Sequence, residues 1–386
     1  MRILHVIDRF HLGGSEEHAT SLAVGLVERG HQCAVVAVRR PTGTDEVGES
    51  QKARLSNAEI PFAEIGGPSV GRNLLLTPFR LLGWISRFKP DLVHVNTDIP
   101  ELMVSLALRM RKFQVVRTIH NTSLWETRPQ TGRICEAGFE EDLVIAVSQG
   151  ALSAHQKLRA QYGLAQSSHQ SVVLGSVSSI PEHDSYARSH LVKKFGANGS
   201  KMLLCFAGRL VEQKGFDTLI DAITGLDREV LEKVELHVFT AGEGLEGFKE
   251  HTHAKNLPIL FHEPVAQIAN LFPAFDGILM PSRWEGYGRV AAEGFLAGTP
   301  VLASDAPGLR ETFPPNWPLK VPPNNPAALR EAVRDLLDGH YDLLELGRAA
   351  SDWARHVFSV DREVDEYAEA YADYLDGCRR GAPQPT

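Results

Sequence analysis

Two glutamates spaced by seven residues are the first candidates for binding chemistry in this chain. Glu285 and Glu293 lie in the stretch 281–300, which reads PSRWEGYGRVAAEGFLAGTP. Gly286 and Gly288 allow a tight turn and a close approach of backbone to a ligand. The helical pattern that follows would offer unpaired N–H groups and a positive dipole end to an anion. Because Glu293 could accept hydrogen bonds from hydroxyl groups, the segment could hold a phosphate together with a sugar or a ribose.

Two cations lie earlier in the same half of the chain. Arg209 ends an expected strand, and Lys214 follows five residues later in the stretch 208–215, GRLVEQKG. A parallel strand would deliver Arg209 to the carboxyl edge of its sheet, where ligands bind in open α/β folds. The two cations could neutralise a diphosphate and stabilise charge that develops on a leaving group. A solvated loop is the structural alternative for the same residues.

The first half of the chain carries weaker candidates at equivalent places. Gly13 and Gly14, followed by Ser15 as a cap, form a helix start that suits an anion. His120 ends an expected strand, and Asp98 follows another one. Side chains at the carboxyl ends of parallel strands face the ligand edge. Capping and packing are the structural alternatives here.

These residues need strands and helices that alternate along the chain, and the hydrophobic pattern indicates that alternation. Buried strands are expected at 3–7, 33–38, 91–96, 114–120 and 142–148, and again at 201–210, 234–242, 257–263, 277–282 and 299–304. Helical patterns include 15–30 and 102–112. The chain is therefore predicted to be an α/β protein with two doubly wound parallel sheets. The irregular stretch 166–195 is the expected linker, and the last residues are expected to be disordered.

Composition agrees with two globular domains. The chain has 386 residues, of which 43% are hydrophobic and 23% charged. This length exceeds the number of residues that a single hydrophobic core usually organises. No run approaches the ~20 apolar residues that span a bilayer. The four cysteines are scattered, so neither a disulfide framework nor a zinc site is expected, and a reducing cytoplasm fits. The net charge of −8 gives no reason to expect a nucleic-acid partner.

The segment 285–311, with the G-R-x4-K-G pattern at 208–215, resembles the donor-binding region of glycosyltransferase family 4. The resemblance extends over essentially the whole chain. It implies a retaining glycosyltransferase of the GT-B fold, with two Rossmann-like domains facing a cleft. The expected domains are an acceptor-side domain at 1–180, completed by a returning helix at 361–378, and a donor domain at 181–360.

The resemblance also implies roles for the residues of the second domain. Arg209 and Lys214 would bind the pyrophosphate, and Glu293 would hold the ribose. Glu285 would contact the donor sugar as a catalytic residue. The donor-binding residues implied here are Arg209, Lys214, Gly286, Tyr287, Gly288, Arg289 and Glu293.

In the first domain the family's G-G-x-E loop approaches the donor phosphates or the acceptor. By resemblance, Gly13 and Gly14 would bind the donor, and His120 would contact its sugar as the second catalytic residue. The expected acceptor residues are Glu16, Asp98 and Asn121.

This chain departs from the family at two places. The family's P-N-G-V-D after the last first-domain strand is replaced by VVLGSVSSIPE at 172–182, which puts an acceptor or hinge role of that loop in doubt. His262 and Glu263 stand where the family usually has a glycine near the nucleotide base, so the identity of the base stays open.

The implied reaction moves a hexose-type sugar from a nucleotide-diphosphate sugar to a glycan or lipid-linked acceptor. Cell-envelope polysaccharide or lipopolysaccharide synthesis is the expected setting. The sequence has no D-x-D, so neither a metal nor another cofactor is expected. No carboxylate is placed as a covalent nucleophile, which favours a front-face mechanism.

A peripheral contact with the inner face of the cytoplasmic membrane is a further hypothesis. The helical pattern 102–112 combines apolar residues with Arg109, Arg111 and Lys112, and anionic lipids attract such cations. A core-packed helix with a basic end is the alternative. Other cations that could join the same face are Arg72, Arg80, Arg87 and Lys89.

Three other functions remain open at this point. Gly242, Gly244 and Gly247 have the G-x-G-x-x-G spacing of a dehydrogenase, but they fall in the second strand–helix unit after the linker. A non-hydrolysing nucleotide-sugar epimerase would need a further acid–base set, which no segment resembles. A degenerate transferase that only binds nucleotide sugar would retain the same donor residues.

Overall fold

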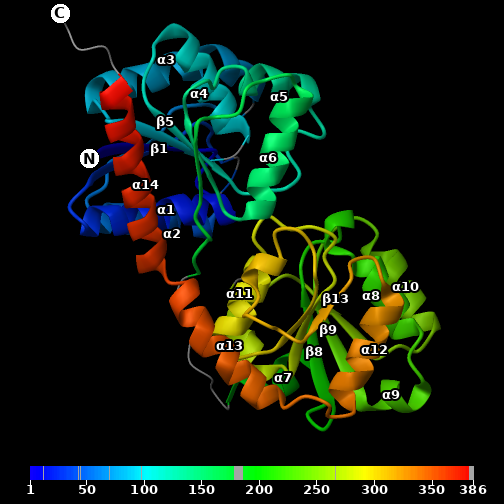
Figure 1. The fold of residues 1–386 in the computed structure, drawn as a ribbon. Helices are drawn as coiled ribbons and strands as arrows, with labels where there is room; N and C mark the ends of the chain where they lie inside the picture. Colours follow the sequence, from blue (N-terminus) through cyan, green and yellow to red (C-terminus); the bar gives the residue numbers. More distant parts are fainter. Residues whose placement is uncertain are drawn as a thin grey trace, which may run out of the picture. The chain divides into compact units, whose positions relative to one another are not determined.

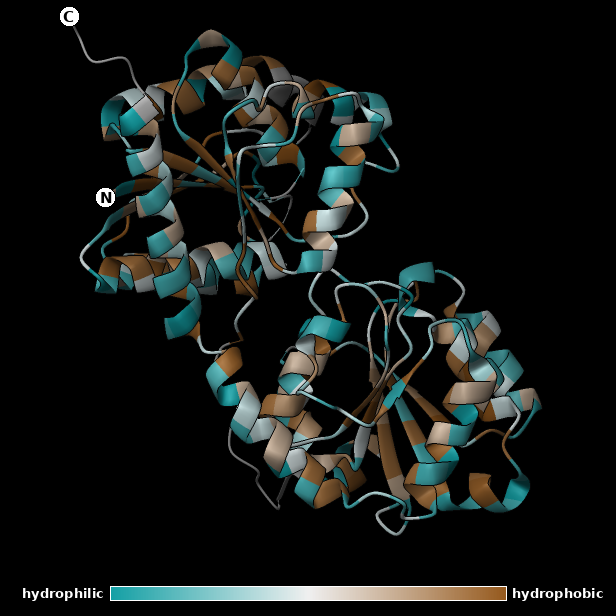
Figure 2. Cartoon of the chain, viewed as in Figure 1, coloured by the Kyte–Doolittle hydropathy of each residue, from teal (hydrophilic) through white to brown (hydrophobic). Residues whose placement is uncertain are grey.

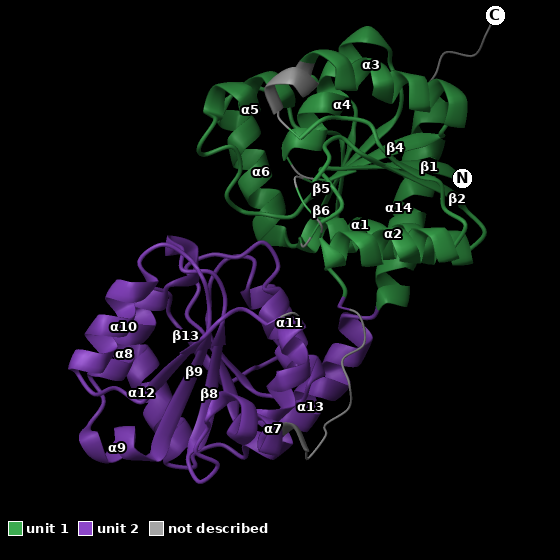
Figure 3. Ribbon diagram, turned by 180° about the vertical axis from the view of Figure 1, so that it is seen from behind, with its two compact units in different colours: residues 1–176, 360–386 green, residues 177–359 purple. Residues whose placement is uncertain are grey.

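The chain was analysed as a computed structural model that describes residues 1–11, 13–41, 43, 45–68, 70–96, 98–177, 186–265 and 267–381. It divides into two compact units (Figure 3). Unit 1 comprises Met1–Ser176 and Val360–Thr386, and unit 2 comprises Val177–Ser359. The chain therefore leaves unit 1 after Ser176 and returns to it at Val360.

Unit 1 is built on a parallel seven-stranded sheet with the order β3-β2-β1-β4-β5-β6-β7. The strand order reverses between β1 and β4, which is the point where ligands bind in doubly wound sheets. The central strands are continuous apolar runs because helices cover both faces. The strands are β1 (Arg2–Ile7), β2 (Gln32–Ala37), β3 (Phe62–Glu64), β4 (Leu92–Asn96), β5 (Val115–Ile119), β6 (Leu143–Ala146) and β7 (His169–Val172).

The helices of unit 1 lie on both faces of this sheet (Figure 1). They are α1 (Gly14–Glu28), α2 (Glu46–Asn57), α3 (Val70–Phe88), α4 (Asp98–Met110), α5 (Pro129–Glu136), α6 (Gln149–Gln161) and α14 (Val360–Gly381). One core contains α1 and α14, and the other contains α3 and α4.

The last helix, α14, packs on unit 1 through an apolar stripe at helical spacing. Val364, Tyr367 and Tyr371 are all fully buried in the core that also contains α1. The two helices approach closely at Gly25, where an added Cβ would lie 2.6 Å from Cγ2 of Val364. The C-terminal helix is thus an integral part of unit 1.

Unit 2 contains a parallel six-stranded sheet with the order β10-β9-β8-β11-β12-β13. Its order reverses between β8 and β11, which is where ligands bind in such sheets. The predicted donor residues lie in the segments that follow these two strands. The strands are β8 (Met202–Ala207), β9 (Val234–Phe239), β10 (Ile259–His262), β11 (Gly277–Met280), β12 (Val301–Ser304) and β13 (Lys320–Val321). Figure 2 shows how hydrophobic the strands of both sheets are.

The helices of unit 2 complete the second α/β layer arrangement. They are α7 (Tyr186–Phe195), α8 (Phe216–Thr224), α9 (Arg228–Lys233), α10 (Leu245–Ala254), α11 (Arg289–Leu296), α12 (Pro326–Leu337) and α13 (Leu343–Val357), with 3-10 turns η1 (Glu212–Lys214), η2 (Ile268–Ala274) and η3 (Arg310–Thr312). The predicted α/β alternation with two doubly wound parallel sheets is confirmed.

The differences from the sequence analysis are confined to short elements. The strands β3, β7 and β13 were not predicted, because β3 and β7 are short and only partly buried and β13 has two residues. The stretch 166–195, expected to be irregular, contains β7 and α7. Residues 178–185 of that stretch and the predicted disordered end, 382–386, lie outside the described residues. Of the helices that the structure describes, none is long and apolar enough to cross a membrane.

Candidate functional site

The loop between β11 and α11 carries the two glutamates and is built around glycines. Gly288 is the N-cap residue of α11 and has a left-handed backbone with φ 76°. A Cβ there would lie 2.5 Å from Cδ1 of Leu309, and a Cβ at Gly308 would lie 1.9 Å from the carbonyl oxygen of Glu285. Glycine is therefore required twice, and the backbone of Glu285 is held against the segment that follows β12.

Glu285 contacts hydrogen-bond donors from its own loop and from the distant loop that carries Lys214. Its Oε1 lies 2.6 Å from Nζ of Lys214 and accepts a hydrogen bond of 2.8 Å from Oγ of Ser282. Its Oε2 lies 3.3 Å from Nε2 of Gln213. The residue is 6% exposed, so this carboxylate is a buried charge with a cation beside it.

Lys214 reaches Glu285 because its own loop packs against the end of β11. Gly215 has φ 60°, and a Cβ there would lie 2.2 Å from the carbonyl oxygen of Pro281. Arg283 also ties the two loops together, because its backbone N–H donates to the carbonyl of Gln213. The predicted K-G pattern thus has a structural cause, the close approach of two loops at the carboxyl edge of the sheet.

Arg209 lies at the same edge, directly after β8, and its residue surface is exposed. Within the part of the chain that the structure describes, its guanidinium has no ion-pair partner. This exposed cation, in the same loop as Lys214, is available to a phosphate group.

Glu293 is one turn into α11 and does not join the Glu285 cluster. Its Oε1 accepts a hydrogen bond of 2.7 Å from Nε of Arg289, four residues earlier on the helix. Its side chain is largely buried, whereas that of Arg289 is more exposed. The two glutamates of the E-x7-E pattern therefore present separate carboxylates, one at the loop and one on the helix.

The G-x-G-x-x-G spacing has a packing role in this fold. Gly242 has φ 145°, and a Cβ there would lie 3.3 Å from the backbone of Leu210. The N–H of Leu210 donates to the carbonyl of Ala241. The turn after β9 thus supports the segment that carries Arg209, and this accounts for Gly242 without a dinucleotide.

His262, one of the departures from the family pattern, is also packed internally. Its Nε2 lies 2.9 Å from Nδ1 of His237, and the two rings stack. Burial and the charge of His237 lower the pKa of His262 to about 4. His262 is therefore neutral at neutral pH and is packed against His237 within unit 2.

In unit 1, the loop after β1 folds back on itself around Glu16. A Cβ at Gly13 would lie 2.2 Å from Oε2 of Glu16, so the glycine makes room for this carboxylate. The prediction that Ser15 caps the helix is wrong. The N-cap residue is Gly13, and the Ser15 hydroxyl instead donates to Oε2 of Glu16 at 2.7 Å. Gly14 begins α1 and is exposed.

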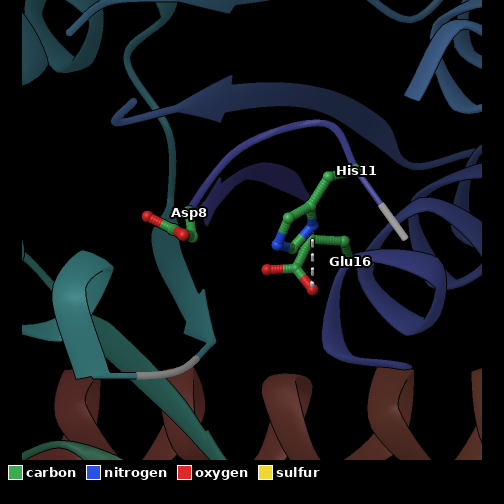
Figure 4. Close-up of side chains that lie close together, drawn as sticks. All are labelled: Asp8, His11 and Glu16. Atoms are coloured by element: carbon green, nitrogen blue, oxygen red, sulfur yellow. Dashed lines mark ion pairs between the residues drawn. The ribbon is translucent and has the colours of Figure 1, made fainter. Parts of the chain in front are cut away.

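Asp8, His11 and Glu16 are the one group of potential metal ligands found among the described residues (Figure 4). Nδ1 of His11 lies 3.9 Å from Oε2 of Glu16. Both carboxylate oxygens of Asp8 accept hydrogen bonds from Arg39, and Arg9 also contacts Asp8. Since these guanidiniums already supply positive charge, we assign Asp8 to ion pairing.

Burial dominates the electrostatics of Glu16. It raises the pKa of the carboxyl group, against the opposing effects of the Ser15 hydrogen bond and of His11. Glu16 is 4% exposed and turned toward its own loop. The structure therefore places this predicted acceptor residue in the scaffold of the loop.

His120 follows β5 and meets the side chain of Asn96 at the end of β4. Nε2 of His120 lies 2.9 Å from Oδ1 of Asn96. Burial and the charge of the neighbouring His18 hold the pKa of His120 well below its usual value of 6.5. The imidazole is therefore neutral at neutral pH. Asn121, the next residue, is exposed.

Asp98, the first residue of α4, lines a cavity of about 330 Å³ in unit 1. The cavity combines cations, carboxylates, hydroxyls and an aromatic residue, a mixture that suits a polar ligand. Its lining residues are Arg39, Asp98, Ile99, Ser123, Trp125, Glu126, Thr127 and Arg128. Asn121 is not among them.

Several of these residues were missed by the sequence analysis. Gln213 adjoins Lys214 and Ser282 lies three residues before Glu285, but nothing local indicates that their side chains contact Glu285. Asn96 ends a predicted strand, which is the same signal that selected His120, and could have been found. Arg39 and Arg128 lie in loops without a recognisable pattern.

Comparisons with known proteins cover both units. Residues 12–168 match the family described as Glycosyltransferase Family 4, and residues 188–353 match the one described as Glycosyl transferases group 1. A glycogen synthase of Mycobacterium tuberculosis is 26% identical over 424 residues, covering 100% of this chain and 97% of that protein. A D-inositol 3-phosphate glycosyltransferase of Xylanimonas cellulosilytica is 32% identical over 200 residues, covering 48% and 47% of the two chains.

Solved structures share the fold over almost the full length. Anabaena Alr3699/HepE in complex with UDP has a TM-score of 0.77 at 20% identity, covering 97% of this chain and 100% of that one. The same protein is also known with UDP-glucose. WaaG, a glycosyltransferase involved in lipopolysaccharide biosynthesis, has a TM-score of 0.69 at 15% identity, covering 95% and 98%.

Proposed function

Because this chain is a glycosyltransferase of family 4 with the GT-B fold, we propose that it transfers a hexose-type sugar with retention of configuration. The donor is a nucleotide-diphosphate sugar, and the acceptor is a glycan or a lipid-linked glycan. The contact between Lys214 and Glu285 is the observation that carries the proposal. It joins a cation for the diphosphate to a carboxylate for the sugar at the carboxyl edge of one sheet.

Different side chains of unit 2 contact different parts of the donor. An ammonium group carries three N–H donors, and since Glu285 engages Lys214 through one oxygen, Lys214 keeps donors for phosphate oxygens. Arg209 adds a guanidinium for bidentate hydrogen bonds. The start of α11 adds its positive dipole end, and Glu293 accepts hydrogen bonds from the ribose.

The reaction needs no covalent intermediate. The acceptor hydroxyl attacks C1 of the sugar on the face from which the diphosphate departs. The bond from C1 to the diphosphate breaks, the bond to the acceptor oxygen forms, and the leaving diphosphate oxygen takes the proton of the hydroxyl. Glu285 and neutral His120 position the sugar, while Arg209 and Lys214 stabilise the departing charge without a metal.

The donor and the biological setting are proposed from the relatives. UDP-glucose is the first donor to test, because Anabaena HepE binds it. Lipopolysaccharide or another envelope polysaccharide is the proposed product class, because WaaG acts in that synthesis. The acceptor would enter the cavity lined by Asp98, which lies in unit 1.

A thermal-shift screen against UDP, GDP, ADP, dTDP and their common sugars, without added metal, tests the donor site. A ligand at about 100 times its Kd stabilises the folded state by about 2.7 kcal/mol. One nucleotide series is expected to raise Tm, and the Lys214→Ala variant is expected to lose that shift. If no diphosphate raises Tm, the donor proposal is wrong and a degenerate site takes its place.

We also propose that the protein contacts the cytoplasmic face of a membrane, but through α3 and not through α4. The apolar face of α4 is buried, with Met103, Val104 and Ala107 at 0% exposure, which supports the core-packed alternative for 102–112. On α3, by contrast, Leu75 and Phe79 are 74% and 63% exposed.

Charge on the same side of α3 favours an anionic surface. Leu76 is 56% exposed beside Leu75, and Arg80 and Arg87 are exposed further along the helix. Arg111 from the end of α4 joins them, because it donates a hydrogen bond of 2.8 Å to Ser86 of α3. The helix contains no acidic residue. Apolar side chains next to cations are the pattern of interfacial helices.

A further inference from the structure

Four side chains of unit 1 form a continuous series that runs from Glu363 through His18 and His120 to Asn96. Glu363 of α14 is 1% exposed, and its Oε1 lies 3.3 Å from Nε2 of His18 on α1. The ring of His18 packs edge-on against the ring of His120, with centroids 5.1 Å apart and an angle of 74°. Nε2 of His120 meets Oδ1 of Asn96 at 2.9 Å. The series therefore links the C-terminal helix to the predicted sugar-contacting residue.

We propose that Glu363 and His18 are positioning residues for His120. The 3.3 Å contact with Glu363 fixes the ring of His18, and that ring holds the imidazole of His120 in the orientation that Asn96 selects. The consequence for catalysis rests on the proposed function, in which His120 contacts the donor sugar. The positioning itself is a property of unit 1 alone.

The contacts of Glu363 explain why the orientation of His18 is specified. Burial raises the pKa of the Glu363 carboxyl, but the charge of His18 and the hydrogen bonds from Ser176 outweigh burial and keep the pKa below its usual value. A buried carboxylate that stays ionised needs partners at fixed places. Both the backbone N–H and the hydroxyl of Ser176 donate to it, so His18 completes a defined set.

The ring of His18 is confined from a second side. The Tyr367 ring on α14 lies 5.3 Å from it, centroid to centroid. Tyr367 is itself fixed by a 3.1 Å hydrogen bond to the hydroxyl of Thr118 on β5. His18 is thus held between α14 and the residue that follows β5.

The arrangement selects one tautomer of His120. Since Oδ1 of Asn96 is an acceptor, Nε2 of the neutral imidazole carries the proton. Nδ1 is then left with a lone pair that can accept a hydrogen bond from a sugar hydroxyl. Without the His18 ring, the His120 ring could turn over and exchange its two nitrogens. In the turned ring, Nδ1 would no longer be placed to accept the hydrogen bond from the sugar hydroxyl.

The series also joins the two places where the chain passes between the units. Ser176 is the last residue of unit 1 before unit 2, and Glu363 follows the return of the chain at Val360. The His120 site is therefore complete only when α14 has docked on α1.

Nitrogen NMR of histidine side chains tests the positioning without any substrate. The full-length protein is labelled with 15N-histidine, and the His120 signals are assigned by their loss in His120→Gln. The wild type is expected to show one neutral tautomer with the proton on Nε2. In Glu363→Gln and in His18→Ala, the two His120 nitrogen shifts are expected to move toward an average of both tautomers. Unchanged His120 shifts in both variants would overturn the proposal.

Tyr374→Phe is the matched control on the same helix. It removes hydrogen bonds from the Tyr374 hydroxyl to Gln114 and to the carbonyl of Glu141, and these residues lie outside the series. The His120 signals are expected to stay at their wild-type shifts. A change as large as that in Glu363→Gln would show that any loosening of α14 disturbs His120, which contradicts a specific role of Glu363.

Turnover of UDP-glucose gives the functional test through a double-mutant cycle. Glu363→Gln is expected to lower kcat about tenfold with KM within about twofold, and to have no further effect in a His120→Ala background. An equal loss in both backgrounds would make Glu363 a general stability residue and overturn the proposal. If the wild type turns over none of the nucleotide sugars, the proposed function fails, and the NMR result alone decides the positioning.

Discussion

The ammonium group of Lys214 lies 2.6 Å from Oε1 of Glu285, although 71 residues separate them in the chain. Each residue was singled out by its own local pattern, and the fold brings them into contact at the carboxyl edge of the second sheet. The buried carboxylate and the cation support each other, since neither group is stable there alone. This contact joins two of the proposed donor-binding residues of unit 2 in one ion pair.

Lys214→Ala is expected to lower kcat/KM for the nucleotide sugar by roughly 100-fold or more. The variant loses a diphosphate contact and leaves the Glu285 carboxylate without its cation, so Tm is also expected to fall by a few degrees. Steady-state kinetics and calorimetry measure both effects. Lys249→Ala is the control, because Lys249 pairs with Glu246 on the exposed helix α10. Near-normal transfer by Lys214→Ala would refute the assignment of the donor site.

Glu293→Ala is expected to abolish most transfer, by roughly 100-fold in kcat/KM, while the fold remains intact. The variant removes the carboxylate proposed to hold the ribose and frees Arg289 from its 2.7 Å contact. Kinetics should be compared with circular dichroism of the same sample. Glu331→Ala, which breaks an exposed pair with Arg334 on α12, should behave like the wild type. Full activity of Glu293→Ala would end the ribose assignment.

The membrane contact is expected to depend on both apolar side chains and charge. Wild-type protein should bind vesicles that contain anionic lipid, and added salt should release it because ions screen the cations of the surface. Replacing Leu75, Leu76 and Phe79 by serine should abolish binding in a flotation assay. Leu344→Ser removes an equally exposed leucine (72%) from unit 2 and should leave binding unchanged. Failure of the wild type to bind at low salt would dismiss α3 as a membrane contact.

A buried carboxyl group gives unit 1 a predictable pH dependence. Burial raises the pKa of Glu101 well above its ordinary 4.5, although the charge of Arg117 opposes the shift. Above pH 4.5 and up to the raised pKa, the folded chain therefore holds more protons at Glu101 than the unfolded chain. Its contribution to stability is full below pH 4.5 and is lost as the pH rises toward the raised pKa.

Glu101→Gln should remove that loss, because glutamine stays neutral at every pH. The Tm of the variant is expected to exceed that of the wild type at pH 8 and to approach it at pH 4.5, as measured by calorimetry. Glu140→Gln, at a carboxylate whose side chain is 74% exposed, serves as the control. A variant whose Tm runs parallel to the wild type across this range would show that Glu101 does not titrate between the two states.

The parts of the fold that could be predicted are those with strong local signals. Strands such as β1 and β8 are continuous apolar runs buried between helices, and their positions agree with the prediction. The strands β3 and β7 could not be predicted, since each is short and only partly buried. Their place in the sheet depends on neighbouring strands and not on their own composition.

The sequence by itself determined the α/β class and the two-sheet organisation, and it selected the residues proposed for the donor segment. Those features depend on apolar periodicity, on glycine at left-handed positions and on short-range spacing, all of which are local. Only the tertiary structure decided that Glu285 pairs with Lys214, that Glu16 is buried in its own loop and that Glu363 reaches His18. The exposure of Leu75, Leu76 and Phe79 on α3 was also decided by the tertiary structure. It depends on which face of the helix the core leaves uncovered. Packing between distant segments decides which of these charged groups form pairs, and local spacing does not predict those pairs.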